Sequence, residues 1–243
     1  MIDACKAAPA RGAQANLSDG CSCVYPPQTL KLEDCSSRGL GSELYIVEGD
    51  SASSAVCRVR DARHQAVLPM QGKPLNAIRA TPKKVAANPW LLALTAALGT
   101  GIGDAFEIRK ARYDRVILLM DADADGIHCA ALLLMFFHRW MRPLIENARI
   151  VMARAPLATI RLGAEQIHVR SEAEYRAECE RLRNSGISNF ATNRYRGLAG
   201  MDLRVLAATC VNPQTRVLLS MGTADADSAI AVFGGDSLSG TQR

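Results

Sequence analysis

Two apolar segments of the chain each lead directly into carboxylates. One ends at Asp121, Asp123 and Asp125, which alternate with alanine, and the other ends at Glu48. Parallel strands of an α/β protein gather the side chains at their carboxyl ends along one edge of the sheet. Residues two apart on an extended chain share a face, so Asp121 and Asp123 are expected to converge on one hard cation. The pattern therefore predicts a magnesium site, with these two aspartates as direct ligands and Asp125 close by or acting through water.

A calcium-binding EF-hand loop begins with a similar pattern. Asp121, Asp123, Asp125 and Gly126 fit its first half, but Leu132 stands where that loop needs a bidentate glutamate. A strand rather than a helix is also expected before the aspartates. An EF-hand is therefore excluded, and an acidic turn with a purely structural role is the alternative to a Mg²⁺ site.

Alternating strands and helices are expected to position these carboxylates. Strands are predicted at 43–47, 66–70, 115–120 and 149–153, and helices at 88–98 and 127–140. This alternation predicts an α/β domain with a mainly parallel sheet. Farther on, a short strand and a charged helix at 172–182 are expected, followed by a small, mainly helical tail. Thr223 or Asp225 is expected to cap a helix in that tail.

Bulk properties exclude several classes of protein. The 243 residues are enough for one substantial domain with a smaller appendage, and the hydrophobic fraction of 49% is ordinary for a soluble protein. The first thirty residues hold no apolar signal segment, and no run reaches the roughly 18 apolar residues of a membrane span. The eight cysteines include no Cys-x-x-Cys pair, which favours reduced thiols over zinc sites. A cytoplasmic protein without a membrane partner is predicted.

Basic residues gather in one segment of the chain. The net charge is +5, and residues 58–84 carry seven lysines and arginines against one acidic residue. Beside an acidic metal site, such a segment favours contact with DNA phosphates, and Lys83 and Lys84 are predicted to take part. The alternative is an ordinary solvated face.

Four segments, in order, resemble the TOPRIM region of type IIA DNA topoisomerase B subunits, the gyrase and topoisomerase IV family. They read YIVEGDSA at 45–52, LPMQGKPLN at 68–76, MDADADG at 120–126 and RYRGLAGM at 194–201. The resemblance implies a Rossmann-like TOPRIM domain at 39–160, after a loose arm at 1–38 and before a C-terminal tail region at 161–243.

The resemblance also implies roles for single residues. Glu48 would be a metal ligand and the general acid–base that handles the proton on the DNA 3′ oxygen. Mg²⁺ would be the cofactor, with Mn²⁺ as a possible replacement. Lys73, and with less support Asn76, would contact DNA phosphate, while the alternative for Lys73 is a simple surface lysine.

The implied partners are double-stranded DNA and a tyrosine-bearing A-type subunit. ATP would act only through an ATPase domain to which nothing in this sequence corresponds, so the chain alone is expected neither to hydrolyse ATP nor to relax DNA. Gln71 and Gly200 depart from the family pattern, at positions expected to affect DNA binding and docking of the partner subunit. The first hypothesis is a module for reversible DNA cleavage and religation. A catalytically idle truncated paralogue is the second, and a stand-alone TOPRIM nuclease or primase-like enzyme is the least favoured.

Overall fold

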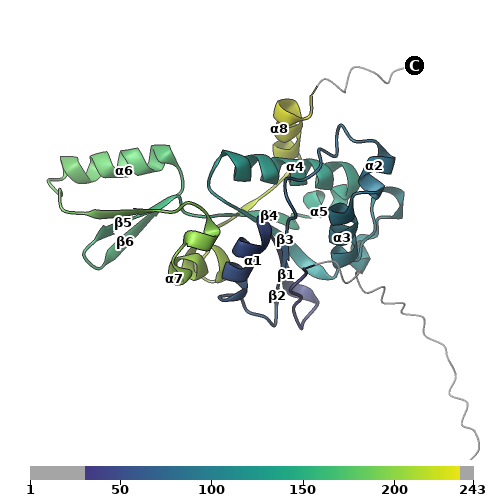
Figure 1. Cartoon of the computed structure of the whole chain (residues 1–243), viewed down its shortest axis with the longest axis horizontal. Coiled ribbons are helices and arrows are strands. Elements are labelled where there is room, and N and C mark those ends of the chain that lie inside the picture. The colour runs from purple at the N-terminus through teal and green to yellow at the C-terminus, as the bar shows by residue number, and fades with distance from the viewer. Residues whose placement is uncertain (1–30, 236–243) are drawn as a thin grey trace, which may run out of the picture.

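A five-stranded sheet lies at the centre of the computed structural model, which describes residues 31–235 (Figure 1). Its strands are β1 (Gly39–Val47), β2 (Gln65–Pro69), β3 (Tyr113–Met120), β4 (Ile150–Arg154) and β8 (Leu218–Ser220). Their order across the sheet is β2-β1-β3-β4-β8. The first four run parallel, and β8 pairs antiparallel with β4. The predicted α/β fold with a mainly parallel sheet is confirmed.

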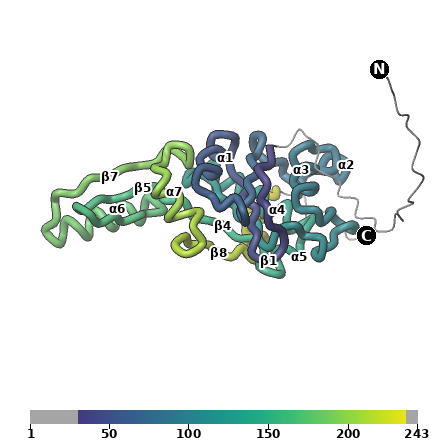
Figure 2. The backbone as a smooth tube through the Cα atoms, turned by 90° about the horizontal axis from the view of Figure 1, so that it is seen from below, coloured from purple at the N-terminus to yellow at the C-terminus, as the bar shows by residue number. Residues whose placement is uncertain are grey.

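Helices cover both faces of this sheet (Figures 1 and 2). One face carries α2 (Pro82–Ala86), α3 (Pro89–Leu98), α4 (Ala124–Trp140) and α5 (Arg142–Glu146), and α8 (Thr223–Phe233) lies on α4. The other face carries α1 (Gly49–Cys57), α7 (Leu203–Leu206) and the π-helical turn Ala207–Val211. Side chains alternate along a strand, so Leu44 and Ile46 of β1 join the first core and Tyr45 and Val47 the second.

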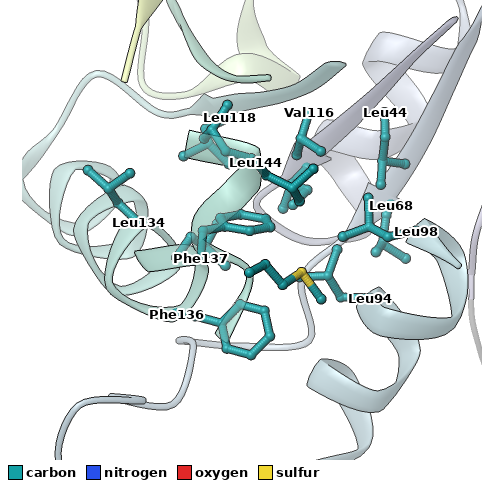
Figure 3. Close-up of a cluster of buried hydrophobic side chains, with 14 of the residues drawn as sticks. Leu44, Leu68, Leu94, Leu98, Val116, Leu118, Leu134, Phe136, Phe137 and Leu144 are labelled. Atoms are coloured by element: carbon teal, nitrogen blue, oxygen red, sulfur yellow. The ribbon is translucent and has the colours of Figure 1, made fainter. Parts of the chain in front are cut away.

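The first core holds α4 against the sheet (Figure 3). Leu44, Leu68 and Leu118 extend from three neighbouring strands toward Phe136 and Phe137 of α4, and all five side chains are at most 1% exposed. Full burial of one such side chain stabilises a fold by about 1.5–3 kcal/mol. This contact holds α4 along the sheet, and the acidic segment lies between the end of β3 and the start of α4.

A smaller antiparallel sheet projects from the main body (Figures 1 and 2). It contains β5 (Ala158–Leu162), β6 (Glu165–Val169) and β7 (Ala191–Arg194) in the order β6-β5-β7, and α6 (Glu172–Asn184) covers it. This lobe has its own small core, in which Ile160, Val169 and Leu182 meet. The chain then returns to the main body beside the acidic segment.

The predicted elements agree closely with the structure. Every predicted strand of the main sheet and every predicted helix has a counterpart shifted by only a few residues. The helix expected near residue 223 is present as α8, and Asp225 Oδ2 accepts a hydrogen bond from Gly222 N–H at its start (2.8 Å). Elements α1, α2, α5, β7 and β8 were not predicted from the sequence, and the single strand expected before α6 is a pair of strands, β5 and β6. The tail is mainly helical, but β8 returns to the main sheet.

Most of the predicted arm, residues 1–30, lies outside the described residues. Its described end is held on the domain: Glu33 and Val67 exchange two backbone hydrogen bonds of 2.9 Å, and Tyr113 O–H donates to Asp34 (2.6 Å). The domain limits at 38 and 160 stay predictions. The cysteines within residues 31–235 are free thiols. None of the helices in this range has the length and apolar character needed to cross a membrane.

Candidate functional site

The carboxyl ends of β1 and β3 bring Glu48 and Asp121 together. The two strands are parallel neighbours with Val47 opposite Leu119, so the residues that follow them leave the sheet side by side. Glu48 Oε1 accepts a hydrogen bond from the Asp121 backbone N–H (3.0 Å). Gly49, at φ +69°, makes the sharp turn that follows Glu48. The two acidic segments therefore meet at one edge of the sheet.

Negative charge at this edge is poorly compensated. Partial burial raises the pKa of Glu48, and the carboxylates of Asp121, Asp123 and Asp125 raise it further, while the Asp121 N–H opposes the shift. Burial also raises the pKa of Asp121, with a smaller contribution from Asp123. Within residues 31–235, neither Glu48 nor Asp121 forms a salt bridge with a basic side chain. Bound cations would relieve this repulsion.

Asp123 and Asp125 make other contacts in this arrangement. Asp123 is the N-cap of α4, and its Oδ1 accepts a hydrogen bond from Gly126 N–H (2.8 Å). Asp125 pairs with Lys73, whose Nζ lies 2.9 Å from Asp125 Oδ1 and 3.4 Å from His128 Nδ1. This hydrogen bond lowers the pKa of Asp125 and raises that of Lys73. The ion pair is exposed, so water screens it strongly.

The donor chemistry of the edge fits a hard divalent cation, because every candidate ligand is a carboxylate. The side-chain arrangement does not form a coordination site: within the part of the chain that the structure describes, no three His, Cys, Asp or Glu side chains are placed to hold one ion. Asp123 caps its helix and Asp125 pairs with Lys73, which accounts for this spread. The four predicted ligands thus lie at one edge without converging on one point.

A contact that holds Asp121 was not predicted from the sequence. Leu198 backbone N–H donates to Asp121 Oδ1 (2.8 Å), across 77 residues of chain. Gly197 adopts φ +135°, and a Cβ atom there would lie only 2.7 Å from Asp121 Oδ2. A side chain at position 197 would therefore displace the carboxylate. The signal was present, since both residues lie in the RYRGLAGM segment, but spacing alone does not show what they contact.

The predicted DNA-contact residues divide into two groups. Lys73, Lys83 and Lys84 are exposed, the last two on α2. The Asn76 side-chain amide instead donates to the Phe233 carbonyl at the end of α8 (2.9 Å), and its oxygen accepts from the Ile78 and Arg79 N–H groups. The structure places Asn76 in an internal contact that joins its loop to α8.

Three tyrosines in or beside the segments that resemble the TOPRIM family form buried contacts. Tyr45 O–H lies 3.3 Å from the Cys210 carbonyl, and burial raises the pKa of the Tyr45 phenol. Tyr113 bonds to Asp34, and Tyr195 lies 3.0 Å from Thr159 Oγ1. None of the three is at the carboxylate edge in an exposed position.

Comparison with known proteins leads to the same segments. The Toprim domain family matches residues 43–155. The DNA gyrase B subunits of Halalkalibacterium halodurans and Thermotoga maritima are each 42% identical to this chain over 204 residues, and that of Archaeoglobus fulgidus is 40% identical over 204 residues. The matches cover 84% of this chain and 32% of each relative, so the chain spans about a third of their length. Residues 43–155 are therefore a Toprim domain, and the chain belongs with the Toprim region of type IIA DNA topoisomerase B subunits.

Proposed function

We propose that this chain is the Mg²⁺-binding Toprim module of a type IIA DNA topoisomerase B-like subunit. With a tyrosine-bearing A-type subunit it would support reversible cleavage and religation of double-stranded DNA in the cytoplasm. ATP would enter only through an ATPase domain of the kind that B subunits carry. The similarity to DNA gyrase B subunits over 84% of the chain supports this proposal.

The observation that carries the proposal is the junction of Glu48 with Asp121. The Glu48 carboxylate accepts a hydrogen bond from the Asp121 backbone N–H, and the pKa of each of the two carboxyl groups is raised. A folded protein that leaves charge uncompensated at one exposed edge keeps an energetic cost there, and such sites are commonly functional. Glu48 is thereby suited to hold or release a proton at its carboxylate oxygen.

Glu48 and Asp121 would hold Mg²⁺ or Mn²⁺, with Asp123 and Asp125 supplying further oxygen ligands. When bound, the metal would neutralise charge on the scissile phosphate and the leaving oxygen. Gly197 and Leu198 keep the Asp121 carboxylate oriented. Lys73 would contact a neighbouring DNA phosphate, together with the exposed Lys83 and Lys84 on α2.

A catalytically idle paralogue that binds DNA or a topoisomerase partner is the second candidate. The spread of the four carboxylates favours it, because Asp123 and Asp125 both have partners within the protein. Gln71 and Gly200, which depart from the family pattern, agree with this reading. The two candidates differ in whether a cleaved DNA product forms.

A cleavage assay separates these candidates. The chain is mixed with a gyrase A-type subunit, supercoiled DNA and Mg²⁺, and linear DNA is measured after detergent and protease treatment. Glu48→Gln keeps the shape of the side chain but removes its proton-transfer group, so the linear product should fall by at least about 100-fold. Glu146→Gln is the matched control, because Glu146 is an exposed glutamate on α5 whose partner is Arg142.

Each contrary outcome points to one rival. If mixtures with several A-type subunits give no linear DNA, the idle-paralogue candidate replaces the proposal. Cleavage by the chain alone in Mg²⁺ would instead favour a stand-alone nuclease.

A further inference from the structure

A groove lies directly beside the carboxylate edge, on the β4 side of Asp121. It has a volume of about 200 Å³, and Asp121 and Ala122 form the wall that it shares with the candidate site. The opposite wall is the start of the small lobe, where Arg170 and Ser171 precede α6, and Arg154 ends β4. None of the sequence motifs assigns this groove a role.

Two arginines give the far wall of the groove a positive charge. Among the described residues, Glu174 is the carboxylate that pairs with Arg154 (Oε1 to Nη2, 3.5 Å), and no carboxylate pairs with the Arg170 guanidinium. Glu174 Oε2 accepts a hydrogen bond only from the backbone N–H of Arg170 (2.6 Å). Two guanidinium groups against one carboxylate leave one net positive charge. A basic wall therefore faces the acidic Asp121 across a narrow space.

Arg170 has an unused hydrogen-bond donor in this region. Its Nε is shielded from solvent and has no acceptor among residues 31–235. A buried donor without a partner is costly, so a rotation of the Arg170 side chain that brings its guanidinium to a ligand oxygen in the groove would remove that cost. An anionic oxygen fits best, because charge-assisted bonds to guanidinium groups are the stronger ones.

The rest of the lining is apolar. Met120, Ala130 and Met152 form part of it, and Ile127 at the start of α4 is 65% exposed, unusual for a large aliphatic side chain. Cavities that enclose a whole small molecule measure about 300–1,000 Å³. This groove is smaller, so it suits one repeating unit of a polymer whose other units lie outside the groove. A sugar with its phosphate combines the apolar face and the anionic oxygen that the walls require.

We propose that Arg154 and Arg170 bind a backbone phosphate of the DNA strand next to the phosphate at the carboxylate site, with its sugar against Ile127. This inference rests on the proposed function and extends it, because Lys73 follows β2 and Arg154 ends β4, on opposite sides of β3 and Asp121 in the strand order. The DNA backbone would then cross the whole carboxyl edge of the sheet.

Salt-dependent DNA binding tests the proposal. Fluorescence anisotropy with a short duplex gives the slope of log affinity against log salt, and each lost phosphate contact lowers that slope by about 0.9. The double variant Arg154→Gln, Arg170→Gln should bind about tenfold more weakly, with the magnitude of the slope reduced by about 0.9, because both arginines are proposed to bind the same phosphate. Arg176→Gln, Arg183→Gln is the matched control, since both residues are exposed on α6 of the same lobe. The control should keep the wild-type slope within about 0.5.

Two further variants guard against misfolding as the cause. Arg154→Lys, Arg170→Lys keeps both charges and should retain most of the slope. Ile127→Asp removes no arginine but adds negative charge to the groove, so it should also weaken binding. Leu40→Asp is its control, because Leu40 is 93% exposed at the opposite edge of the sheet.

The outcomes separate the two proposals. If the Arg154 and Arg170 variant has the same slope as the Arg176 and Arg183 control, the proposal that the groove binds a DNA phosphate is overturned. If Lys73→Gln still lowers the slope in that case, the proposed function stands and only the groove fails. If the wild-type chain binds no DNA, both are overturned.

Discussion

Strand β1 carries Glu43 where its pairing with β2 begins, and Glu48 follows its end. Glu43 is buried, with a side chain 9% exposed, and both of its oxygens pair with Arg216, whose side chain is 3% exposed. Gln65 Nε2 donates to the same carboxylate (3.0 Å). Glu48 is more exposed, and three aspartates rather than an arginine surround it. Two glutamates five residues apart thus stand in opposite electrostatic settings.

The difference separates a structural carboxylate from a candidate functional one. A buried charge must be paired and hydrogen-bonded, and the Glu43 network meets that requirement while tying β1 to the segment before β8. The carboxylates at the other end of the sheet keep their repulsion. Within the described part of the chain, the fold therefore pairs the negative charge of Glu43 but leaves that of Glu48 and Asp121 without a cation. This difference indicates that the carboxyl edge binds a cationic ligand.

The largest expected effect comes from removing the cation of the structural pair. Arg216→Met leaves Glu43 ionised and buried without its partner, so the free energy of unfolding should fall by about 3–5 kcal/mol. Urea unfolding measures this change. The double variant Glu43→Gln, Arg216→Met should regain much of the loss, and a single variant as stable as wild type would show that the pair does not matter.

Removing a charge from the functional edge should have the opposite sign. Asp121→Asn keeps an oxygen for the Leu198 N–H and removes the repulsion, so it should raise the free energy of unfolding by about 1 kcal/mol at pH 7 in a chelating buffer. The pKa of Asp121 is raised in the folded protein, so its ionisation costs stability only above the unfolded pKa of about 3.9.

The gain in unfolding free energy from Asp121→Asn should therefore disappear below about pH 3, where the Asp121 carboxyl group of the wild type is protonated in both the folded and the unfolded state. Asp114→Asn, at the opposite end of β3, should change stability by less than about 0.5 kcal/mol. Destabilisation by Asp121→Asn at pH 7 would contradict the assignment of uncompensated charge.

Local pattern was enough to predict the sheet and the position of its acidic edge. The strands before Glu48 and Asp121 end in uninterrupted apolar runs, and α4 has a clear helical period, so their types follow from short stretches of sequence. The meeting of Glu48 with Asp121 follows from the rule that parallel strands end at the same edge. The four segments that resemble the TOPRIM family also indicate this sheet and its acidic edge.

Contacts between distant segments could not be predicted in the same way. Leu198 reaches Asp121 across 77 residues, and Asn76 reaches Phe233 across 157. No local spacing encodes either contact. Strand β8 is only three residues long, and its place in the sheet depends on pairing with β4. The capping role of Asp123 was also missed, because the same residue type serves a helix cap and a metal ligand equally well.

The central claim is that the carboxyl edge of the sheet binds a divalent cation through its aspartates. Isothermal titration calorimetry with Mg²⁺ and Mn²⁺ tests it directly on the whole chain. Wild-type protein should bind weakly, and Asp121→Asn, Asp123→Asn should lower the affinity at least about tenfold, because coordination needs ionised oxygen ligands. Asp114→Asn should bind as wild type does. Equal binding by the wild type and the double variant would contradict the account.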